Sequence, residues 1–489
     1  MASLRDASGQ GREIVVVQGL GFVGAAVAAV LSSTRSEEAP RYEVVGVDLA
    51  SSAGYWKIAR LQAGEFPFDC PDPNLVDMVR QGVLEAGNLH ATCYEEVYSL
   101  AHVIVVDVPL DVTDRTQSEP NKIDIRWDGF EAALRAIGRR MRGDALVLVE
   151  TTVPIGTTQF VARDILLQER ARRGVTEPLL LAHAYERVMP GPHYANSIRR
   201  FWRSFAGIDP ASTRRAQAFL SSFIETDQFP TRNLQDPSAS ELAKLLENSY
   251  RASNIALIYE WTLLAEEIGV NLFEIVDSIR VRKGTHDNMR YPGFGVGGYC
   301  LTKDSLLAQW ALKNFFHSPL ELSVTLNALR INYRMPLHSL DLARLIIKGP
   351  LAAQTIVICG LCYLPDVPDT RNAPAEVLYD YLLEQGAVAR VHDPLVATWP
   401  ERPHASVTRQ LEEALRQCSV AVLAVNHQVY SRMTAADWRK VLPAGCGLVD
   451  AANVLSDEKA GALHAAGHRL MGVGKGHWRK RGYQEYVQT

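Results

Sequence analysis

Cys300 has the clearest potential for covalent chemistry in this sequence, because it closes a turn that contains Gly295, Gly297 and Gly298. Closely spaced glycines let backbone N–H groups approach a ligand and bind an anion. A helical pattern begins at Asp304, so the thiol lies near a predicted helix N-terminus, where the dipole favours a thiolate. Asp304 follows by four residues, one helical turn away on the same face. These features predict a nucleophile site, and a buried cysteine in a turn is the structural alternative.

A glycine-rich fingerprint near the N-terminus predicts a dinucleotide site. Gly19, Gly21 and Gly24 follow a β-branched strand over 13–17 and open an alanine-rich helix over 25–31. Gly19 is expected to form the turn, Gly21 to admit the pyrophosphate and Gly24 to pack helix on strand. Asp48 ends the next strand and is expected to accept ribose hydroxyls and to repel a 2′-phosphate, which predicts NAD; a turn or capping role is its alternative. The other expected cofactor-binding residues are Phe22, Val23, Val108, Pro109 and Thr152.

A long helix is predicted between an apparent capping box at 238–241 and Gly269. It would extend about 42 Å, enough to connect two domains and to build a subunit interface, so a homodimer is expected. Lys244 and Asn248 share one face of this helix, and Arg251 lies close by. A solvated polar face is the alternative explanation for these side chains.

Two further candidates lie where strands of the first sheet should end. Thr152 follows a strand predicted over 145–151, and ligands of doubly wound sheets bind beyond the carboxyl ends of strands. Thr152 could therefore reach a substrate or a bound water. Glu186 is the second candidate, with an ordinary loop ion pair to Arg187 as its alternative.

The alternation of strands and helices predicts an α/β fold with two Rossmann-like doubly wound domains, joined by the long helix and a helical dimerisation region. A further strand of the first sheet is predicted over 102–108. The second pattern begins at 355, with later strands over 389–393, 419–425 and 448–453. Its first turn, Gly360-Leu361-Cys362, lacks the second glycine of the fingerprint. The second domain is therefore expected to bind something other than a full dinucleotide.

The composition excludes several classes of protein. A net charge of −4 does not suggest a nucleic-acid partner. Seven scattered cysteines, an odd number, favour a reducing compartment. The Cys359–Cys362 pair lies in a strand-like apolar run without further ligands, so no metal site is predicted and a redox pair is disfavoured. The N-terminus is polar and no apolar run is long enough to span a membrane, which predicts a cytoplasmic protein without a membrane partner.

Together these motifs resemble the UDP-glucose/GDP-mannose dehydrogenase family, the nucleotide-sugar 6-dehydrogenases, from about residue 13 to 475. The segments that carry the resemblance, in the family's order, are GLGFVG, ETTVPIGTT, ERVMPG, ELAKLLENSYRASNIA, GVGGYCLTKD and GLCYLPDVPDTRNAP. The resemblance implies an NAD-binding domain over 1–209, a central helical substrate and dimerisation domain over 210–348, a nucleotide-sugar-binding domain over 349–475 and a polar tail over 476–489.

The resemblance also implies a four-electron oxidation of a C6 alcohol to a carboxylate, with two NAD⁺ and one water. Cys300 would add to the aldehyde as a thiolate, and the thiohemiacetal would be oxidised to a thioester that water releases. Lys244 and Asn248 would stabilise charge on the C6 oxygen, and Asp304 would take part in proton transfer. Glu186 and Thr152 would position or activate the water. The residues implied to contact the nucleotide sugar are Glu186, Arg187, Val188, Lys244, Asn248, Arg251, Tyr291, Gly297 and Arg371.

Three departures from the family pattern leave the sugar open. Leu364 follows Tyr363 where a lysine is usual, His286 lies near the position of an upstream arginine, and Leu110 replaces a threonine. UDP-glucose, a UDP-N-acetylhexosamine and GDP-mannose all fit the core motifs, and the ERVMPG form favours a UDP-sugar. Two rival functions remain: a single-step hydroxyacid-type dehydrogenase with a structural Cys300, and a non-catalytic nucleotide-sugar sensor. The NADH formed per substrate discriminates among them.

Overall fold

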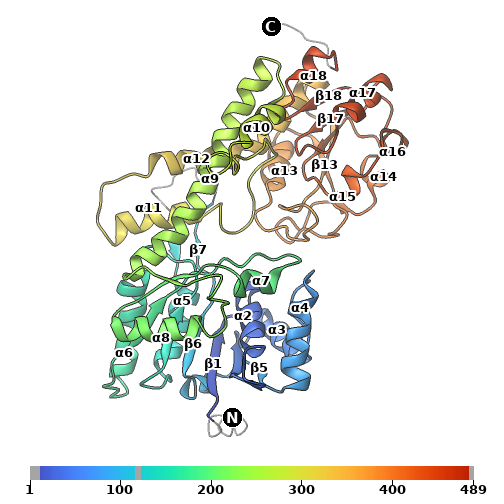
Figure 1. Cartoon of the computed structure of the whole chain (residues 1–489). Coiled ribbons are helices and arrows are strands. Elements are labelled where there is room, and N and C mark those ends of the chain that lie inside the picture. Colours follow the sequence, from blue (N-terminus) through green and yellow to red (C-terminus); the bar gives the residue numbers. More distant parts are fainter. Residues whose placement is uncertain (1–10, 116–122, 484–489) are drawn as a thin grey trace. The chain divides into compact units, whose positions relative to one another are not determined.

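The computed structural model describes residues 11–115 and 123–483, which divide into two compact units. Unit 1 contains residues 11–113, 123–246 and 306–320, and unit 2 contains residues 114–115, 247–305 and 321–483. Figure 1 colours these elements along the chain. Among the helices of the described ranges, none combines the length and the apolar character that crossing a bilayer requires.

Unit 1 is built on an eight-stranded sheet with the order β12-β11-β10-β9-β6-β1-β4-β5. Its neighbours pair in parallel except β10 with β11. The central strands are runs of buried valine, isoleucine and leucine, as expected for a sheet covered on both faces. The strands are β1 (Glu13–Gln18), β4 (Tyr42–Val47), β5 (Leu89–Thr92), β6 (Val103–Val106), β9 (Leu146–Val149), β10 (Leu180–His183), β11 (Ser204–Gly207) and β12 (Arg232–Asn233).

The helices of unit 1 cover this sheet with small and apolar side chains. Helix α2 (Phe22–Ser32) packs its alanines on β1 and β4, and α3 (Ser52–Gln62) packs on β5. The remaining helices of eight or more residues that lie wholly in this unit are α4 (Pro73–Arg80), α5 (Asp128–Gly138), α6 (Arg163–Ala171) and α8 (Pro210–Leu220). The strands expected over 13–17, 42–48, 102–108 and 145–151 are confirmed, each within a few residues.

Unit 2 contains a six-stranded parallel sheet with the order β15-β14-β13-β16-β17-β18, covered by α12 (Ser323–Ile347) and α13 (Ala375–Glu384). The expected second Rossmann-like domain is therefore confirmed. Within the predicted polar tail over 476–489, residues 477–480 form α18 and Trp478 is buried, so this part folds onto the domain; residues 484–489 lie outside the described residues. The strands are β13 (Thr355–Cys359), β14 (Val388–His392), β15 (Val407–Thr408), β16 (Val420–Leu423), β17 (Gly447–Asp450) and β18 (Leu470–Gly472).

The long helix α9 (Pro237–Glu267) starts earlier than expected. The predicted capping box at 238–241 is wrong, because Asp236 caps the helix: its Oδ1 accepts from Ser238 N at 2.7 Å. Pro237 takes the first helical position, where its missing N–H has no cost. The Glu241 carboxylate instead accepts from Gly156 N and Thr158 N. Gly269 ends this region with φ of 72°, as expected.

Candidate active site

The fingerprint glycines lie at the point where the strand order of unit 1 reverses, between β1 and β6. Gly19 has φ of 101°, and a Cβ there would lie 2.5 Å from the carbonyl oxygen of Asp107. A Cβ on Gly24 would lie 1.9 Å from the Gly19 carbonyl oxygen. A Cβ on Gly21 would meet no atom within 4 Å. Gly19 and Gly24 are therefore required by the turn itself, whereas Gly21 faces the open space that a pyrophosphate needs.

Asp48 lies directly after β4 and holds the fingerprint turn. Its Oδ2 accepts from Leu20 N at 2.9 Å and pairs with Lys57 Nζ, and its Oδ1 accepts from Leu49 N. The contact with Lys57 was not expected from the sequence. Because Lys57 balances the charge of Asp48, repulsion of a 2′-phosphate by this carboxylate is weaker than the sequence alone predicted. The ribose contact of Asp48 stays a prediction.

The other expected cofactor residues border the same strand ends. The Phe22 ring stacks on Phe68 with centroids 4.0 Å apart. Val23, Val108 and Thr152 are half-buried, and Pro109 is exposed. The hydroxyl of the neighbouring Thr151 donates to the carbonyls of Val106 and Val108, which ties the segments after β9 and β6 together.

Unit 1 brings Lys244 and Glu186 together. Lys244, on α9, donates from Nζ to the backbone carbonyl of Glu186 at 2.9 Å, and it is 8% exposed. The Glu186 carboxylate accepts from Val188 N, so the 186–188 loop is closed on itself. Arg187 donates to the Tyr185 hydroxyl and to the Trp202 carbonyl. The lysine and the acid expected near the substrate oxygen are thus held by one loop.

Unit 2 places Cys300 in a turn that leads into α11 (Asp304–Asn314). Cys300 is exposed, and its backbone carbonyl accepts from Lys303 N and Asp304 N. Gly298 has φ of 82° and donates from N to the Arg371 carbonyl at 3.2 Å. The glycines thus let the nucleophile loop pack against the segment that carries Arg371.

A buried polar cluster lies beneath this loop. Asn248 Nδ2 donates to Asp304 Oδ2 at 2.6 Å, and Lys303 Nζ pairs with Asp304 Oδ1 at 3.3 Å. Lys303 also lies 4.8 Å from the centre of the Tyr299 ring, and both Lys303 and Asp304 are 1% exposed. The structure brings the predicted site residues Asn248 and Asp304 into contact, and their catalytic roles stay predictions. The sequence did not indicate Lys303, although it lies inside the GVGGYCLTKD segment.

Arg115 is a second residue that the sequence did not indicate. It donates to the Tyr299 carbonyl at 3.2 Å and to the Thr302 hydroxyl at 2.8 Å, and its guanidinium lies 4.7 Å from the centre of the Tyr299 ring. These contacts hold residues on both sides of Cys300. Arg115 is far from this loop in the sequence, so no local pattern indicates that it holds the loop.

Arg371 lies close enough to Cys300 for their charges to interact. Its guanidinium donates to Asp369 through Nε at 2.9 Å and Nη2 at 2.5 Å. Burial lowers the pKa of Arg371, but the bonds to Asp369 outweigh burial, and the pKa stands above its usual value. Burial also raises the pKa of the neighbouring Tyr363 to about 12. Arg371 therefore remains a cation beside the thiol, as thiolate chemistry needs.

A cavity of about 190 Å³ lies at the strand ends of the second sheet. Residues 292–295 of the nucleophile-side loop and residues 360–363 of the first turn line it. Nearby, the Tyr291 hydroxyl donates to Asp277 at 2.5 Å, and Gly297 packs on Tyr363. Arg251 is exposed.

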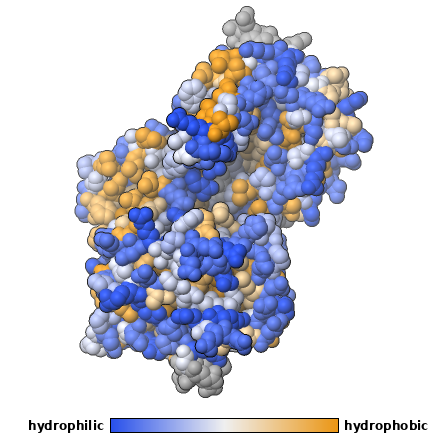
Figure 2. Space-filling model, viewed as in Figure 1, coloured by the Kyte–Doolittle hydropathy of each residue, from blue (hydrophilic) through white to orange (hydrophobic). Residues whose placement is uncertain are grey.

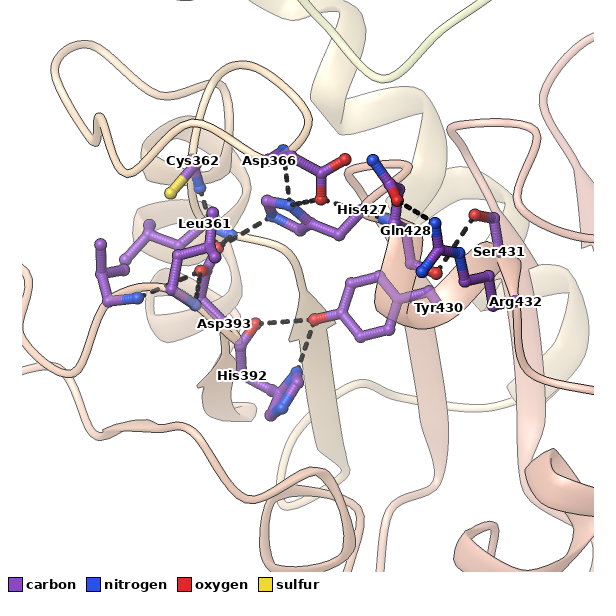
Figure 3. Close-up of polar contacts among 12 residues, drawn as sticks. Leu361, Cys362, Asp366, His392, Asp393, His427, Gln428, Tyr430, Ser431 and Arg432 are labelled. Atoms are coloured by element: carbon purple, nitrogen blue, oxygen red, sulfur yellow. Dashed lines mark hydrogen bonds and ion pairs between the residues drawn. The ribbon is translucent and has the colours of Figure 1, made fainter. Parts of the chain in front are cut away.

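Asp393, at the end of β14, is fully occupied by local donors (Figure 3). It accepts from the backbone N–H groups of Leu361, Cys362, Leu395 and Val396. Burial would raise the pKa of Asp393, but these donors and His427 hold it below its usual value. Both oxygens of Asp393 are thus occupied by donors of its own domain, which agrees with the incomplete fingerprint of this domain.

Cys362, Asp393 and His427 lie within 4.8 Å of one another through their ligand atoms, so their types alone could suggest a metal. The hydrogen bonds argue against that use. Asp366 N donates to His427 Nδ1 at 2.9 Å, so the ring proton is on Nε2, 3.3 Å from Asp393 Oδ2. Neither ring nitrogen then has a lone pair available for a metal ion.

Comparisons with known proteins agree with this geometry. The chain matches three domains of the UDP-glucose/GDP-mannose dehydrogenase family: the NAD binding domain over 13–200, the central domain over 238–333 and the UDP binding domain over 357–457. It is 28% identical to a UDP-N-acetyl-D-mannosamine dehydrogenase of Pyrococcus horikoshii, over 94% of this chain and 99% of that protein. It is 27% identical to an NDP-N-acetyl-D-galactosaminuronic acid dehydrogenase of Ralstonia nicotianae, over 86% of this chain and 92% of that protein.

Solved structures give the same result. The crystal structure of an NDP-N-acetyl-D-galactosaminuronic acid dehydrogenase from Methanosarcina mazei superposes with a TM-score of 0.79 at 27% identity, covering 98% of this chain and 99% of that chain. The family's cofactor, NAD, fits the open space before Gly21 and the helix N-terminus behind it. The chain therefore belongs to the UDP-glucose/GDP-mannose dehydrogenase family and is an NAD-dependent oxidoreductase of nucleotide sugars.

Proposed function

We propose that this enzyme oxidises the C6 alcohol of a UDP-sugar to the carboxylate in two steps, through a thioester on Cys300. The observation that carries the proposal is the exposed Cys300 in its glycine turn, beside the Arg371 cation and above the Asn248–Asp304–Lys303 cluster. The names of the relatives favour an N-acetylated hexosamine as the sugar. The cavity at residues 360–363 supports a nucleotide-binding role for the second sheet domain.

The chemistry balances with the family's cofactor. When bound, NAD⁺ would supply the hydride acceptor for each of the two oxidations. In the first step Lys244 and Asn248 would stabilise the C6 alkoxide as its proton passes through water to Asp304, and loss of one hydride from C6 would leave an aldehyde. The Cys300 thiolate then adds to the aldehyde, and loss of the second hydride leaves a thioester. Glu186 and Thr152 direct a water to the thioester carbon, and cleavage of the C–S bond returns the thiolate and releases the acid.

Replacement of the thiol tests this proposal. Cys300→Ser should bind NAD⁺ as the native enzyme does but form no acid, or only a slowly hydrolysed ester, because serine lacks a stable anion at neutral pH. The assay is a panel of UDP-sugars and GDP-mannose with NAD⁺, followed by NADH absorbance and by separation of the product acid. Cys93→Ser, a change of a half-buried cysteine in unit 1, is the matched control.

The outcomes separate the three functions. Two NADH per sugar in the native enzyme support the thioester route, and one NADH supports the single-step dehydrogenase. Binding of a nucleotide sugar without NADH formation supports the sensor. Acid formation by Cys300→Ser at the native rate would contradict the covalent step.

We propose further that the enzyme is a homodimer formed through α9. Tyr250, Leu257 and Leu264 recur every seven residues, as do Trp261 and Ile268, and each is between 47% and 55% exposed. Figure 2 shows hydrophobic atoms, in orange, gathered along the end of α9 that lies near α10 (Leu272–Arg280). A seven-residue apolar repeat is the pattern with which two helices pack together, and one such stripe can pair with its own copy.

A further inference from the structure

Two carboxyl groups meet at the strand ends of unit 1 without a conventional donor between them. Asp107 follows β6 and Glu150 follows β9, and the register of these neighbouring strands pairs Val106 with Val149, so the two carboxyl groups lie side by side and interact. Asp107 Oδ2 and Glu150 Oε2 are shielded from solvent, and neither finds a donor among the described residues. Two buried acceptors that face each other are satisfied when one of them carries a proton.

The neighbouring charges show which carboxyl keeps the proton. Arg203, 4% exposed, pairs with Glu150 and so stabilises Glu150 as the anion. Within the described part of the chain Asp107 Oδ2 has no hydrogen-bonding partner of this kind, and the charges of both Glu150 and Glu186 act on Asp107. Burial, and then the charges of Glu150 and Glu186, raise the pKa of Asp107 well above its usual value, which Arg203 only partly offsets. Burial raises the pKa of Glu150 as well, but Arg203 and the bond from Asp107 act to lower it, so the shared proton is assigned to Asp107.

Asp107 lies at the point where the dinucleotide must bind. Its N–H donates to the carbonyl of Gln18, the last residue of β1, at 2.8 Å. Its backbone is in contact with Gly19, and its Cβ would lie 3.2 Å from a Cβ on Gly24. The residue itself is half-buried, so it borders both the Glu150 pair and the crevice between β1 and β6. A carboxylate here would lie close to the pyrophosphate of a bound dinucleotide and repel it.

We infer that the enzyme binds NAD(H) with Asp107 in its carboxylic acid form, and that ionisation of Asp107 weakens cofactor binding. Above the pH at which Asp107 of the free enzyme ionises, binding of NAD(H) requires uptake of one proton. The dissociation constant of NAD(H) therefore rises about tenfold for each further pH unit. This role concerns the cofactor alone and is independent of the thioester proposal.

NADH binding without any sugar tests the inference. The dissociation constant is measured by NADH fluorescence between about pH 6 and about pH 9.5, a range that spans a strongly raised carboxyl pKa. We expect the NADH dissociation constant of the native enzyme to increase with pH, with a slope that approaches about tenfold per pH unit. Asp107→Asn keeps a neutral donor toward Glu150. Its NADH dissociation constant should equal that of the native enzyme near pH 6 and should change little as the pH rises. Asp144→Asn is the control, because it removes an exposed acid just before the first residue of β9. It should keep the native pH dependence of NADH binding.

A measurement on the native enzyme alone makes the test independent of how the variant folds. Calorimetric titration of NADH in two buffers of different ionisation enthalpy reports the protons taken up on binding. We expect uptake that approaches one proton at the alkaline end and is absent near pH 6. Native binding that is independent of pH, or an Asp107→Asn variant that retains the native slope and proton uptake, would overturn the inference.

Discussion

Among single residues, Lys303 shows how the nucleophile loop depends on a buried charge. Its ammonium group pairs with Asp304, and the second oxygen of Asp304 accepts from Asn248. A buried ion pair adds little net stability, but removing one partner leaves the other charge without compensation. Lys303 is therefore expected to keep Asp304 in place beneath the Cys300 turn.

Lys303→Met tests this dependence because methionine retains much of the side chain's length without its charge. We expect the free energy of unfolding to fall by about 3 kcal/mol or more, the cost of breaking a buried pair. Urea denaturation measures the loss. The double variant Lys303→Met/Asp304→Asn should recover much of it, since no charge then remains buried. Lys313→Met, at an exposed position of α11, is the control. A loss no larger than that of Lys313→Met would contradict the assignment.

Among the elements, the turn between β1 and α2 contains one glycine that close packing requires and one that leaves space for a ligand. Gly24→Ala would place a Cβ 1.9 Å from the Gly19 carbonyl oxygen, whereas Gly21 has φ of −74° and open space around its Cβ position. We expect Gly24→Ala to lower stability by about 1–3 kcal/mol, as overpacking does. Gly21→Ala should unfold at nearly the native temperature but bind NADH at least about tenfold more weakly, a loss of about 1.4 kcal/mol.

Thermal unfolding without cofactor and NADH fluorescence titration measure the two effects separately. Equal NADH affinity in Gly21→Ala and the native enzyme would show that the pyrophosphate does not approach this position. An unchanged unfolding temperature in Gly24→Ala would show that the turn can rearrange to admit a side chain.

The elements were predictable where local pattern decides structure. The β-branched runs predicted the central strands because a buried parallel strand needs little beyond apolar side chains. The start of α9 was missed because Ser238 and Glu241 have the spacing of a capping box, yet Glu241 binds residues 156–158 instead. Lys303, Arg115 and the Asp107–Glu150 pair were missed for a related reason. Their partners are tertiary neighbours, and a single sequence does not identify those neighbours.

For the whole molecule, the apolar stripe of α9 predicts the assembly state. Trp261 lies at the middle of the exposed repeat, so Trp261→Glu would bury a carboxylate without a partner if two α9 helices pack together. We expect the native enzyme to have twice the chain mass of 54.1 kDa by light scattering, and Trp261→Glu to have the mass of one chain. Leu383→Glu, an equally exposed apolar position on α13, should leave the dimer intact.

The affinity of Trp261→Glu for NADH should stay native, because the cofactor fingerprint and Asp48 belong to unit 1 while Trp261 belongs to unit 2. A native enzyme with the mass of one chain, or a Trp261→Glu variant that keeps the double mass, would place the subunit contact elsewhere or remove it.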